Sequence, residues 1–250
     1  MRVFLERQEP HIAIITIDNP EKLNAMSRGM MQDLGDLWDE LSNDETRCII
    51  ITGSGNRAFC VGADIAGDLD ASAELSKIVN HALLKTDIYR KPIIGAVNGD
   101  CVGGGMELLL PTDIRAATPM ARFGLPEVKW SIYPFGGATI KLIQQIGHIH
   151  AMDLLLTGRL ITAIEAKKLG LINDIVSDGS VIDWALEKAH LIATNSPSAV
   201  QAVKTQISST IAEHTLSREN LEQVLGDQVR AHPNFKEGVT AFLEKRTPKY

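Results

Sequence analysis

The chain is poor in cysteine, and its few cysteines do not pair by spacing. They are Cys48, Cys60 and Cys101. An odd number of well-separated cysteines argues against a disulfide framework, and no pair has the spacing of zinc ligands. The pattern favours a protein of a reducing compartment.

Positive charge is also scarce. The 25 Lys and Arg residues are outnumbered by 31 Asp and Glu residues, which leaves a formal net charge of -6. Nucleic-acid binders usually present a basic face because phosphate contacts dominate their affinity, so the composition argues against a nucleic-acid partner. A polyanionic ligand would have to be held by local cations and backbone N–H groups, not by the overall field.

Long apolar runs are absent. No stretch approaches the roughly 20 apolar residues that a membrane-spanning helix needs, and the N-terminal segment carries Arg2, Glu6 and Arg7 where a signal peptide would be apolar. These features predict a soluble, cytoplasmic protein with no membrane partner. With 250 residues, 44% of them hydrophobic, the chain can bury the core of one large domain.

Several catalytic motifs are missing as well. The sequence has no G-x-S-x-G elbow, no G-x-x-x-x-G-K-[ST] loop and no G-x-G-x-x-G after a strand. His148 and His150 lack a third ligand and helical ligand spacing, so no metal site is expected. These absences argue against a serine hydrolase of that kind, P-loop phosphate binding and dinucleotide binding.

The first half of the chain does contain alternating strand and helix patterns. Strands are predicted at residues 12–17, 48–52, 93–97 and 113–117, with helices after Ser27 and over residues 71–89. The run at 48–52 is continuously apolar, which suits a strand buried on both faces of a mainly parallel sheet. The order of the elements predicts an α/β fold.

The second half becomes helical. Helical patterns run from Val181 onward, with breaks near Pro197 and Pro233 and with Asn234 as the expected cap of the last helix. No internal repeat or Gly/Ser linker separates the parts. We therefore expect residues 1–195 to form an α/β core and residues 196–250 a helical C-terminal region of the same domain.

The segment Gly103-Gly104-Gly105-Met106-Glu107 is the first that could carry chemistry. Glycines let a ligand approach the main chain closely, and a helix start presents free N–H groups and a positive dipole end. A carbonyl oxygen gaining negative charge would be stabilised there. On the glycines alone, a tight strand-to-helix turn without catalytic function explains the segment equally well.

Residues 58–65 (A-F-C-V-G-A-D-I) could supply a second backbone donor at another strand-to-helix junction. Asp64 is a plausible N-cap there, and simple capping is the default interpretation of this segment by itself. Residues 133–139 form a further Gly-rich turn into a helix, which could complete a pocket wall or only start the helix.

Two glutamates stand out in different degrees. Glu107 lies in an otherwise apolar short helix, where a buried carboxylate is costly without partners. Glu127 lies in a loop after a strand and would by itself be taken for a surface residue. Two carboxylates in one pocket can divide acid and base roles, because different environments separate their pKa values.

Taken together, several ordered motifs resemble the crotonase superfamily, the enoyl-CoA hydratase/isomerase group. Motifs at suitable separations along nearly the whole chain are more specific than any one of them. They are residues 19–26 (N-P-E-K-L-N-A-M), 58–65, 96–108, 123–128 (F-G-L-P-E-V), 156–158 (L-T-G), 166–171 and 242–246 (F-L-E-K-R).

The resemblance implies a ββα spiral core with a C-terminal helical region used for trimer formation, in homotrimers or hexamers. It implies that the N–H groups of Ala63 and Gly104 form an oxyanion hole for a thioester carbonyl. The CoA ester would be bound by Lys22, Leu23, Ala25, Ala63, Asp64, Ile65, Gly104 and Pro126, with Phe242 and Lys245 reaching the CoA of a neighbouring subunit.

The resemblance further implies reversible hydration of a 2-enoyl-CoA, with Glu107 as base, Glu127 as acid and no cofactor beyond the CoA of the substrate. A Δ3-Δ2 isomerase is the main alternative. A non-catalytic acyl-CoA-binding or RNA-binding member of the fold is another. The chain departs from the hydratase pattern at Phe135, where a small residue is usual, and Trp130 adds bulk nearby. Both are expected to influence the acyl pocket.

Overall fold

The computed structural model describes residues 1–9, 11–64 and 73–250. The first half contains β1 (Arg2–Glu9), β2 (Ile12–Asp18), η1 (Pro20–Lys22), α1 (Arg28–Ser42), β3 (Cys48–Gly53), β4 (Ala58–Cys60), α2 (Ala73–Ala82), β5 (Ile93–Val97), β6 (Asp100–Val102), α3 (Gly104–Leu109), β7 (Ile114–Ala117) and β8 (Arg122–Gly124). The second half contains η2 (Pro126–Trp130), α4 (Ala138–Ile146), α5 (His148–Thr157), β9 (Ile161–Thr162), α6 (Ala163–Lys168), β10 (Asp174–Ile175), α7 (Val181–Ala193), α8 (Pro197–Ala231) and α9 (Pro233–Leu243).

The strands build two sheets that the chain visits in turn. The larger sheet has the order β1-β2-β3-β5-β7-β10 and the smaller one the order β4-β6-β8-β9. Each passage places one strand in the larger sheet and the next strand in the smaller, as β3 and β4, β5 and β6, and β7 and β8 do. Both sheets are mixed, since β1–β2 and β8–β9 are antiparallel and the other pairs parallel. The predicted α/β spiral core is confirmed.

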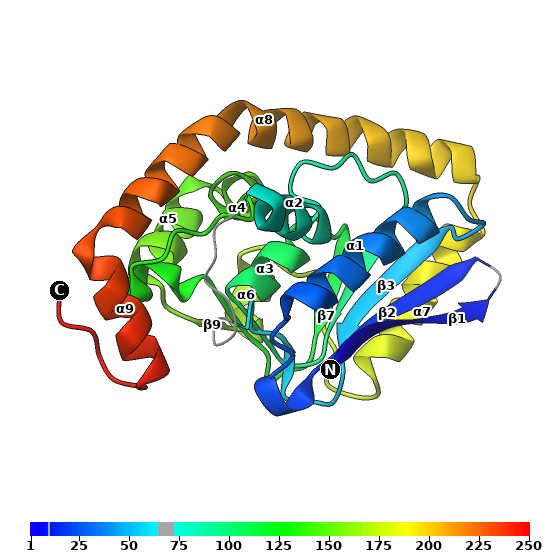
Figure 1. Cartoon of the computed structure of the whole chain (residues 1–250). Helices are drawn as coiled ribbons and strands as arrows, with labels where there is room; N and C mark the ends of the chain where they lie inside the picture. The colour runs from blue at the N-terminus through cyan, green and yellow to red at the C-terminus, as the bar shows by residue number, and fades with distance from the viewer. Residues whose placement is uncertain (10, 65–72) are drawn as a thin grey trace.

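The predicted two-sided burial of residues 48–52 is also confirmed. β3 pairs in parallel with β2 and β5, and every one of its residues is buried. Because side chains alternate along a strand, Ile49 and Ile51 enter the main core, while Cys48 and Ile50 pack against α7 on the opposite face. Figure 1 shows α7 behind the larger sheet.

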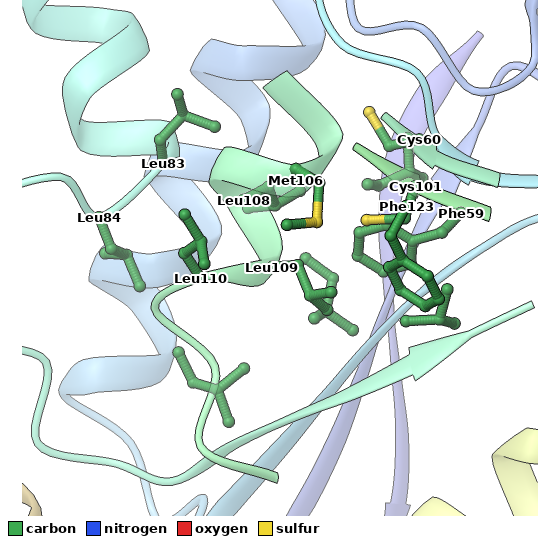
Figure 2. Close-up of a cluster of buried hydrophobic side chains, with 14 of the residues drawn as sticks. Phe59, Cys60, Leu83, Leu84, Cys101, Met106, Leu108, Leu109, Leu110 and Phe123 are labelled. Atoms are coloured by element: carbon green, nitrogen blue, oxygen red, sulfur yellow. The ribbon is translucent and has the colours of Figure 1, made fainter. Parts of the chain in front are cut away.

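Helix α3 is the short apolar helix predicted after the three glycines, and the main core surrounds it. Figure 2 shows its leucines and methionine between two groups of apolar side chains, with Leu110 on the side of Leu83 and Leu84. On the other side lie Phe59, Cys60, Cys101 and Phe123. This packing fixes the rotation of α3 about its axis and therefore the direction in which Glu107 leaves it.

Two predicted helix boundaries were wrong. The helix expected over residues 71–89 ends at Ala82, because the chain turns at Leu84 with a left-handed φ of 45°; residues 71 and 72 lie outside the described ranges. The last helix is capped by His232, not by Asn234: the His232 ring nitrogen accepts from the Asn234 N–H. Thr162 caps α6, with its hydroxyl accepting from the Glu165 N–H at 3.3 Å, while the Glu165 carboxylate pairs with Arg159.

The C-terminal part is dominated by α8, a single helix of 35 residues that leads into α9 (Figure 1). It begins at Pro197, close to the boundary expected between the core and the helical region; that division remains a prediction. Lys204 ties α8 to the core through Asp113, 2.6 Å from both carboxylate oxygens. In the described ranges, no helix combines the length and apolar character needed to cross a lipid bilayer.

Arg115 of β7 closes the turn between α3 and β7. The buried guanidinium donates to the carbonyls of Leu110, Thr112 and Leu171 and to the side chains of Thr112 and Gln145. Burial lowers the pKa of Arg115 to about 10, so the group stays charged at neutral pH. This one buried cation therefore binds several acceptors just beyond α3 and shares the Leu110 carbonyl with the Gln145 amide.

We expect Arg115→Met to lower the free energy of unfolding by roughly 3 kcal/mol, because buried acceptors that lose their donor cost about 1–3 kcal/mol each. Urea unfolding measures the change. Arg122→Met is the matched control, since Arg122 is 57% exposed and forms its one ion pair among the described residues with Asp100, at the surface; its cost should stay below about 1 kcal/mol. Equal losses in the two variants would contradict this role of Arg115.

Candidate active site

Three consecutive glycines, Gly103 and the first two residues of α3, bring two loops into direct contact. Gly103 has φ 59° and ψ -130°, a conformation that side chains disfavour. A Cβ on Gly104 would lie 3.2 Å from the Cα of Gly62, and one on Gly105 would lie 2.0 Å from the Cys60 carbonyl oxygen. The start of α3 therefore packs on the loop that follows β4 with no side chain between them.

Two backbone donors meet at this contact. The Gly104 N–H is at the first position of α3, where no acceptor exists within the helix. Around Ala63, the Met26 N–H donates to Gly62 and the Asp64 N–H donates to Met26, which leaves the Ala63 N–H between these bonds. Within the described part of the chain neither N–H has an acceptor. The loops predicted to carry the oxyanion hole are thus adjacent, while the role of their N–H groups remains a prediction.

The loop after β2 lies against the same segment. Asn24 accepts from the Asn19 N–H and donates to the carbonyls of Ser54 and Ala58, and Leu23 and Asn24 both take left-handed φ values, 54° and 58°. Lys22 reaches Asp64 at 2.5 Å.

Lys22 and Ala25 therefore lie in the loop that contacts Ala63 and Asp64, with Leu23 between them in sequence. That this group binds CoA remains a prediction. Ile65, the last residue expected in this group, lies outside the described ranges.

Glu107 is buried, and its carboxylate accepts a hydrogen bond from the loop before α4. Its side chain is 6% exposed, and its Oε1 accepts from the Gly136 N–H at 2.6 Å. A Cβ on Gly136 would lie 2.6 Å from the Glu107 carboxyl carbon, so the loop before α4 rests directly on this carboxylate. Sequence analysis placed a Gly-rich turn here but did not predict that its N–H binds Glu107.

Glu127 lies against the glycine turn. It lies in the first turn of η2, directly after Pro126, and its Oε1 would be 3.3 Å from a Cβ on Gly103. Its Oε2 is buried and has no hydrogen-bond partner among the described residues. A buried carboxylate oxygen without a donor is unfavourable, so the site favours the protonated form of Glu127 or a bound donor.

The two carboxyls affect each other. Burial and the charge of Glu127 raise the pKa of Glu107 to about 8, against the effect of the Gly136 N–H. Burial raises the pKa of Glu127 to about 7. The pair therefore retains protons at neutral pH that ordinary glutamates would have released, which is the condition that acid/base catalysis needs.

Phe135 and Trp130, the two bulky residues noted beside the hydratase pattern, contact the C-terminal helices. The Phe135 ring packs directly against Gly226 of α8, so closely that a Cβ on Gly226 would lie 2.0 Å from the ring Cζ. Trp130 stacks edge-on against Phe242 with the ring centroids 5.2 Å apart, and its carbonyl lies against Gly238 of α9. Gly226 of α8 accommodates the Phe135 ring, and Phe242 of α9 packs on the Trp130 ring.

Phe242 and Lys245 lie apart from the Lys22 loop. Together with Trp130 they line a surface hollow of about 950 Å³ near the end of the chain. Nothing in the described contacts of this chain brings them to the glutamates, and their predicted place at a neighbouring subunit's CoA remains a prediction.

Replacing Glu107 with Gln should raise the melting temperature at pH 8.5 and change it little at pH 5. Glutamates release their protons near pH 4.5 in the unfolded chain and near pH 7 to 8 in the folded pair. Between about pH 4.5 and pH 8 the folded state therefore holds more protons than the unfolded state, and its stability falls as pH rises. The expected gain at pH 8.5 is at least about 2–4 °C, the shift for 1 kcal/mol in a chain of this length. Calorimetry at both pH values measures it, and an equal change at both would contradict the raised pKa.

Known proteins are similar to this chain in sequence and in fold. The family model described as "Enoyl-CoA hydratase/isomerase" matches residues 7–250. An enoyl-CoA hydratase of Mycobacterium tuberculosis is 42% identical over 98% of this chain and 95% of its own length. A short-chain-enoyl-CoA hydratase of Clostridium acetobutylicum is 33% identical over 98% of this chain and 95% of its own length.

Solved structures agree. A carnitinyl-CoA dehydratase from Mycobacterium avium superposes with a TM-score of 0.89 at 34% identity, covering 99% of this chain and 98% of that one. An enoyl-CoA hydratase from Bacillus anthracis gives a TM-score of 0.79 at 32% identity, covering 100% and 99%. The chain therefore belongs to the enoyl-CoA hydratase/isomerase family, the crotonase superfamily, and has its fold.

Proposed function

We propose that the protein catalyses the reversible hydration of a 2-enoyl-CoA thioester to a 3-hydroxyacyl-CoA. The observation that carries this proposal is the buried pair Glu107 and Glu127, whose pKa values are raised. Glu107 lies on α3, and Glu127 lies against Gly103, next to the Gly104 N–H. Relatives that are 42% and 33% identical bear the name enoyl-CoA hydratase, which supports the same reaction.

The mechanism follows from the residues in place. The thioester carbonyl accepts hydrogen bonds from the Ala63 and Gly104 N–H groups, which stabilise the negative charge of the enolate-like state. Glu107, its carboxylate held by the Gly136 N–H, takes a proton from water as the water oxygen bonds to the β-carbon. Glu127 gives its proton to the α-carbon, and dehydration follows the same path in reverse.

The two carboxylates differ in their hydrogen bonds, whereas their raised pKa values, about 8 for Glu107 and about 7 for Glu127, do not by themselves make Glu107 the base. The assignment of roles follows the family resemblance. A hydrogen bond from a backbone N–H favours the ionised form, and Glu107 has one from Gly136. The Oε2 of Glu127 has no donor within the described ranges, which favours the protonated form of that residue. One ionised base beside one protonated acid is the state that hydration needs.

Glu107→Gln and Glu127→Gln should each lower kcat for hydration about 10²–10⁴-fold, because general acid or base catalysis contributes that much. A panel of enoyl-CoA esters, followed by loss of the conjugated thioester absorbance and by product mass, measures the effect. Glu187→Gln, which changes an exposed glutamate of α7, is the matched control and should keep wild-type activity.

Two outcomes would decide against the proposal. Full activity in both active-site variants would remove the glutamates from the mechanism. A product of unchanged mass would identify isomerisation, which moves a proton without adding water.

We also propose that the protein assembles as a homotrimer or a dimer of trimers and binds CoA along Lys22, Leu23, Ala25 and Asp64, with Phe242 and Lys245 contributed by a neighbouring subunit. Exposed apolar side chains on the C-terminal half of α8 support an assembly surface. They include Leu216 at 59%, Leu221 at 50% and Val224 at 53% exposure.

Lys245→Gln should raise KM for the CoA ester about 10-fold and leave kcat nearly unchanged, because a phosphate contact far from the reacting atoms binds ground state and transition state alike. Lys249→Gln, an exposed lysine of the same C-terminal tail, is the control and should change neither constant. Steady-state kinetics measures both. A fall in kcat at unchanged KM would contradict the binding role.

A further inference from the structure

The loop that holds Glu107 is itself held by α8. Three neighbouring contacts join them: the Phe135 ring fits against Gly226, the Arg230 guanidinium lies 5.1 Å from the centroid of that ring, and a Cβ on Gly137 would lie 3.2 Å from the Thr215 methyl. Gly136, whose N–H binds Glu107, lies between the two residues that α8 touches. The position of this N–H therefore depends on how α8 is seated.

A buried ion pair lies at the same contact. Lys85 and Glu222 of α8 are 4% and 6% exposed, with the ammonium nitrogen 2.6 Å from a carboxylate oxygen. The Gly137 N–H faces Glu222 closely enough to lower its pKa, although burial raises that pKa overall. The second carboxylate oxygen of Glu222 is buried without a hydrogen-bond partner in the described part of the chain.

Such a pair contributes little as a plain stabilising element. The desolvation of two buried charges offsets much of their attraction, and well-packed apolar residues often serve stability as well or better. Sequence analysis gave no sign of this pair, because Lys85 and Glu222 are 137 residues apart and each has a neighbourhood typical of a helix surface. Its place beside the Glu107 loop points to a role in the site.

Charged groups surround Glu107 from every packed element. Glu127 of η2 and Glu222 of α8 raise its pKa, and Lys85, which follows α2, lowers it. Lys141 of α4 also faces Glu107; burial lowers the pKa of Lys141 to about 8, and its ammonium donates to the Leu84 carbonyl. Tyr133, in the loop before α4, faces both Glu107 and Glu222.

We propose that Glu222, paired with Lys85, is a positioning residue of this active site: it seats α8 on the 135–137 loop and so keeps the Gly136 N–H on Glu107. The proposal rests on the proposed hydration. The two charges of the ion pair also balance each other beside the catalytic base. Removing Glu222 alone should therefore favour the ionised form of Glu107, and removing Lys85 alone should favour its protonated form.

The test is the pH profile of kcat/KM for hydration in three variants. Glu222→Gln leaves the Lys85 charge with the more distant and 36% exposed Glu219 at 3.8 Å as its partner, and the pH optimum should fall by about 0.5–1 unit. Lys85→Met leaves the Glu222 charge, and the optimum should rise by a similar amount. The double variant should return the optimum close to the wild-type value. If Glu222→Gln does not fold, the remaining two variants still carry the comparison.

Lys204→Met is the matched control, because it breaks the other buried tie of α8, to Asp113, without altering a charge that faces Glu107. It should lower the melting temperature and leave the pH optimum in place. Superimposable optima in all variants would overturn the proposal. A shift of the same sign in Glu222→Gln and Lys85→Met would overturn the charge balance at Glu107, because loss of the Gly136 N–H alone moves both variants in one direction.

A second readout separates this proposal from the proposed reaction. Carboxyl-carbon NMR of the glutamates titrates Glu107 directly, without substrate, and the resonance is assigned by its loss in Glu107→Gln. Opposite shifts of this titration in the two single variants support the positioning role even if no enoyl-CoA is hydrated. Unchanged titrations overturn it even if hydration is found.

Discussion

The structure depends on the absence of side chains where α3 meets the loop after β4. Gly62, Gly104 and Gly105 allow the two backbones to touch, and the start of α3 lies against the Cys60 carbonyl as a result. Any side chain at this contact would push α3 outward. The N–H groups of Ala63 and Gly104 would then separate, and Glu107 would leave the Gly136 N–H, so one steric condition supports both halves of the site.

The site is built at the expense of stability, and the surrounding core makes that tolerable. A carboxylate in an apolar helix is unfavourable when ionised, yet Glu107 leaves a helix whose other side chains are packed on both sides by the main core (Figure 2). Arg115 then binds carbonyls just beyond the end of that helix. The well-packed side chains of the core let this unfavourable buried carboxylate persist, as is common at functional sites.

Much of the fold could be predicted from local sequence, and the site only in part. The alternating first half and the buried run at residues 48–52 gave the α/β class, because periodicity and apolar runs report burial directly. The strands of the smaller sheet were missed, since β4, β6 and β8 have three residues each and carry too short a pattern. Glu107 stood out chemically, whereas Glu127 was joined to it only by resemblance of the whole chain.

The partners of Glu107 could not be read locally at all. Gly136 acts through its backbone, which any residue possesses, and Lys85 and Glu222 are joined only by the path of α8 across the molecule. The Phe135 ring packs against Gly226 and Arg230, and the Trp130 ring packs against Phe242, while their expected influence on the acyl pocket remains a prediction. Contacts of this kind, between residues far apart in the sequence, can be identified only once the position of α8 is known.

The three cysteines give this fold a set of internal reporters. All are fully buried, and burial raises the pKa of Cys48 and Cys60 to about 12 and that of Cys101 well above its usual value. Alkylating reagents attack the thiolate, so labelling requires that the surrounding structure open first. Cys60 and Cys101 flank the glycine turns, while Cys48 faces α7 on the far side of the larger sheet. Site-resolved labelling rates would therefore time the opening of each region separately.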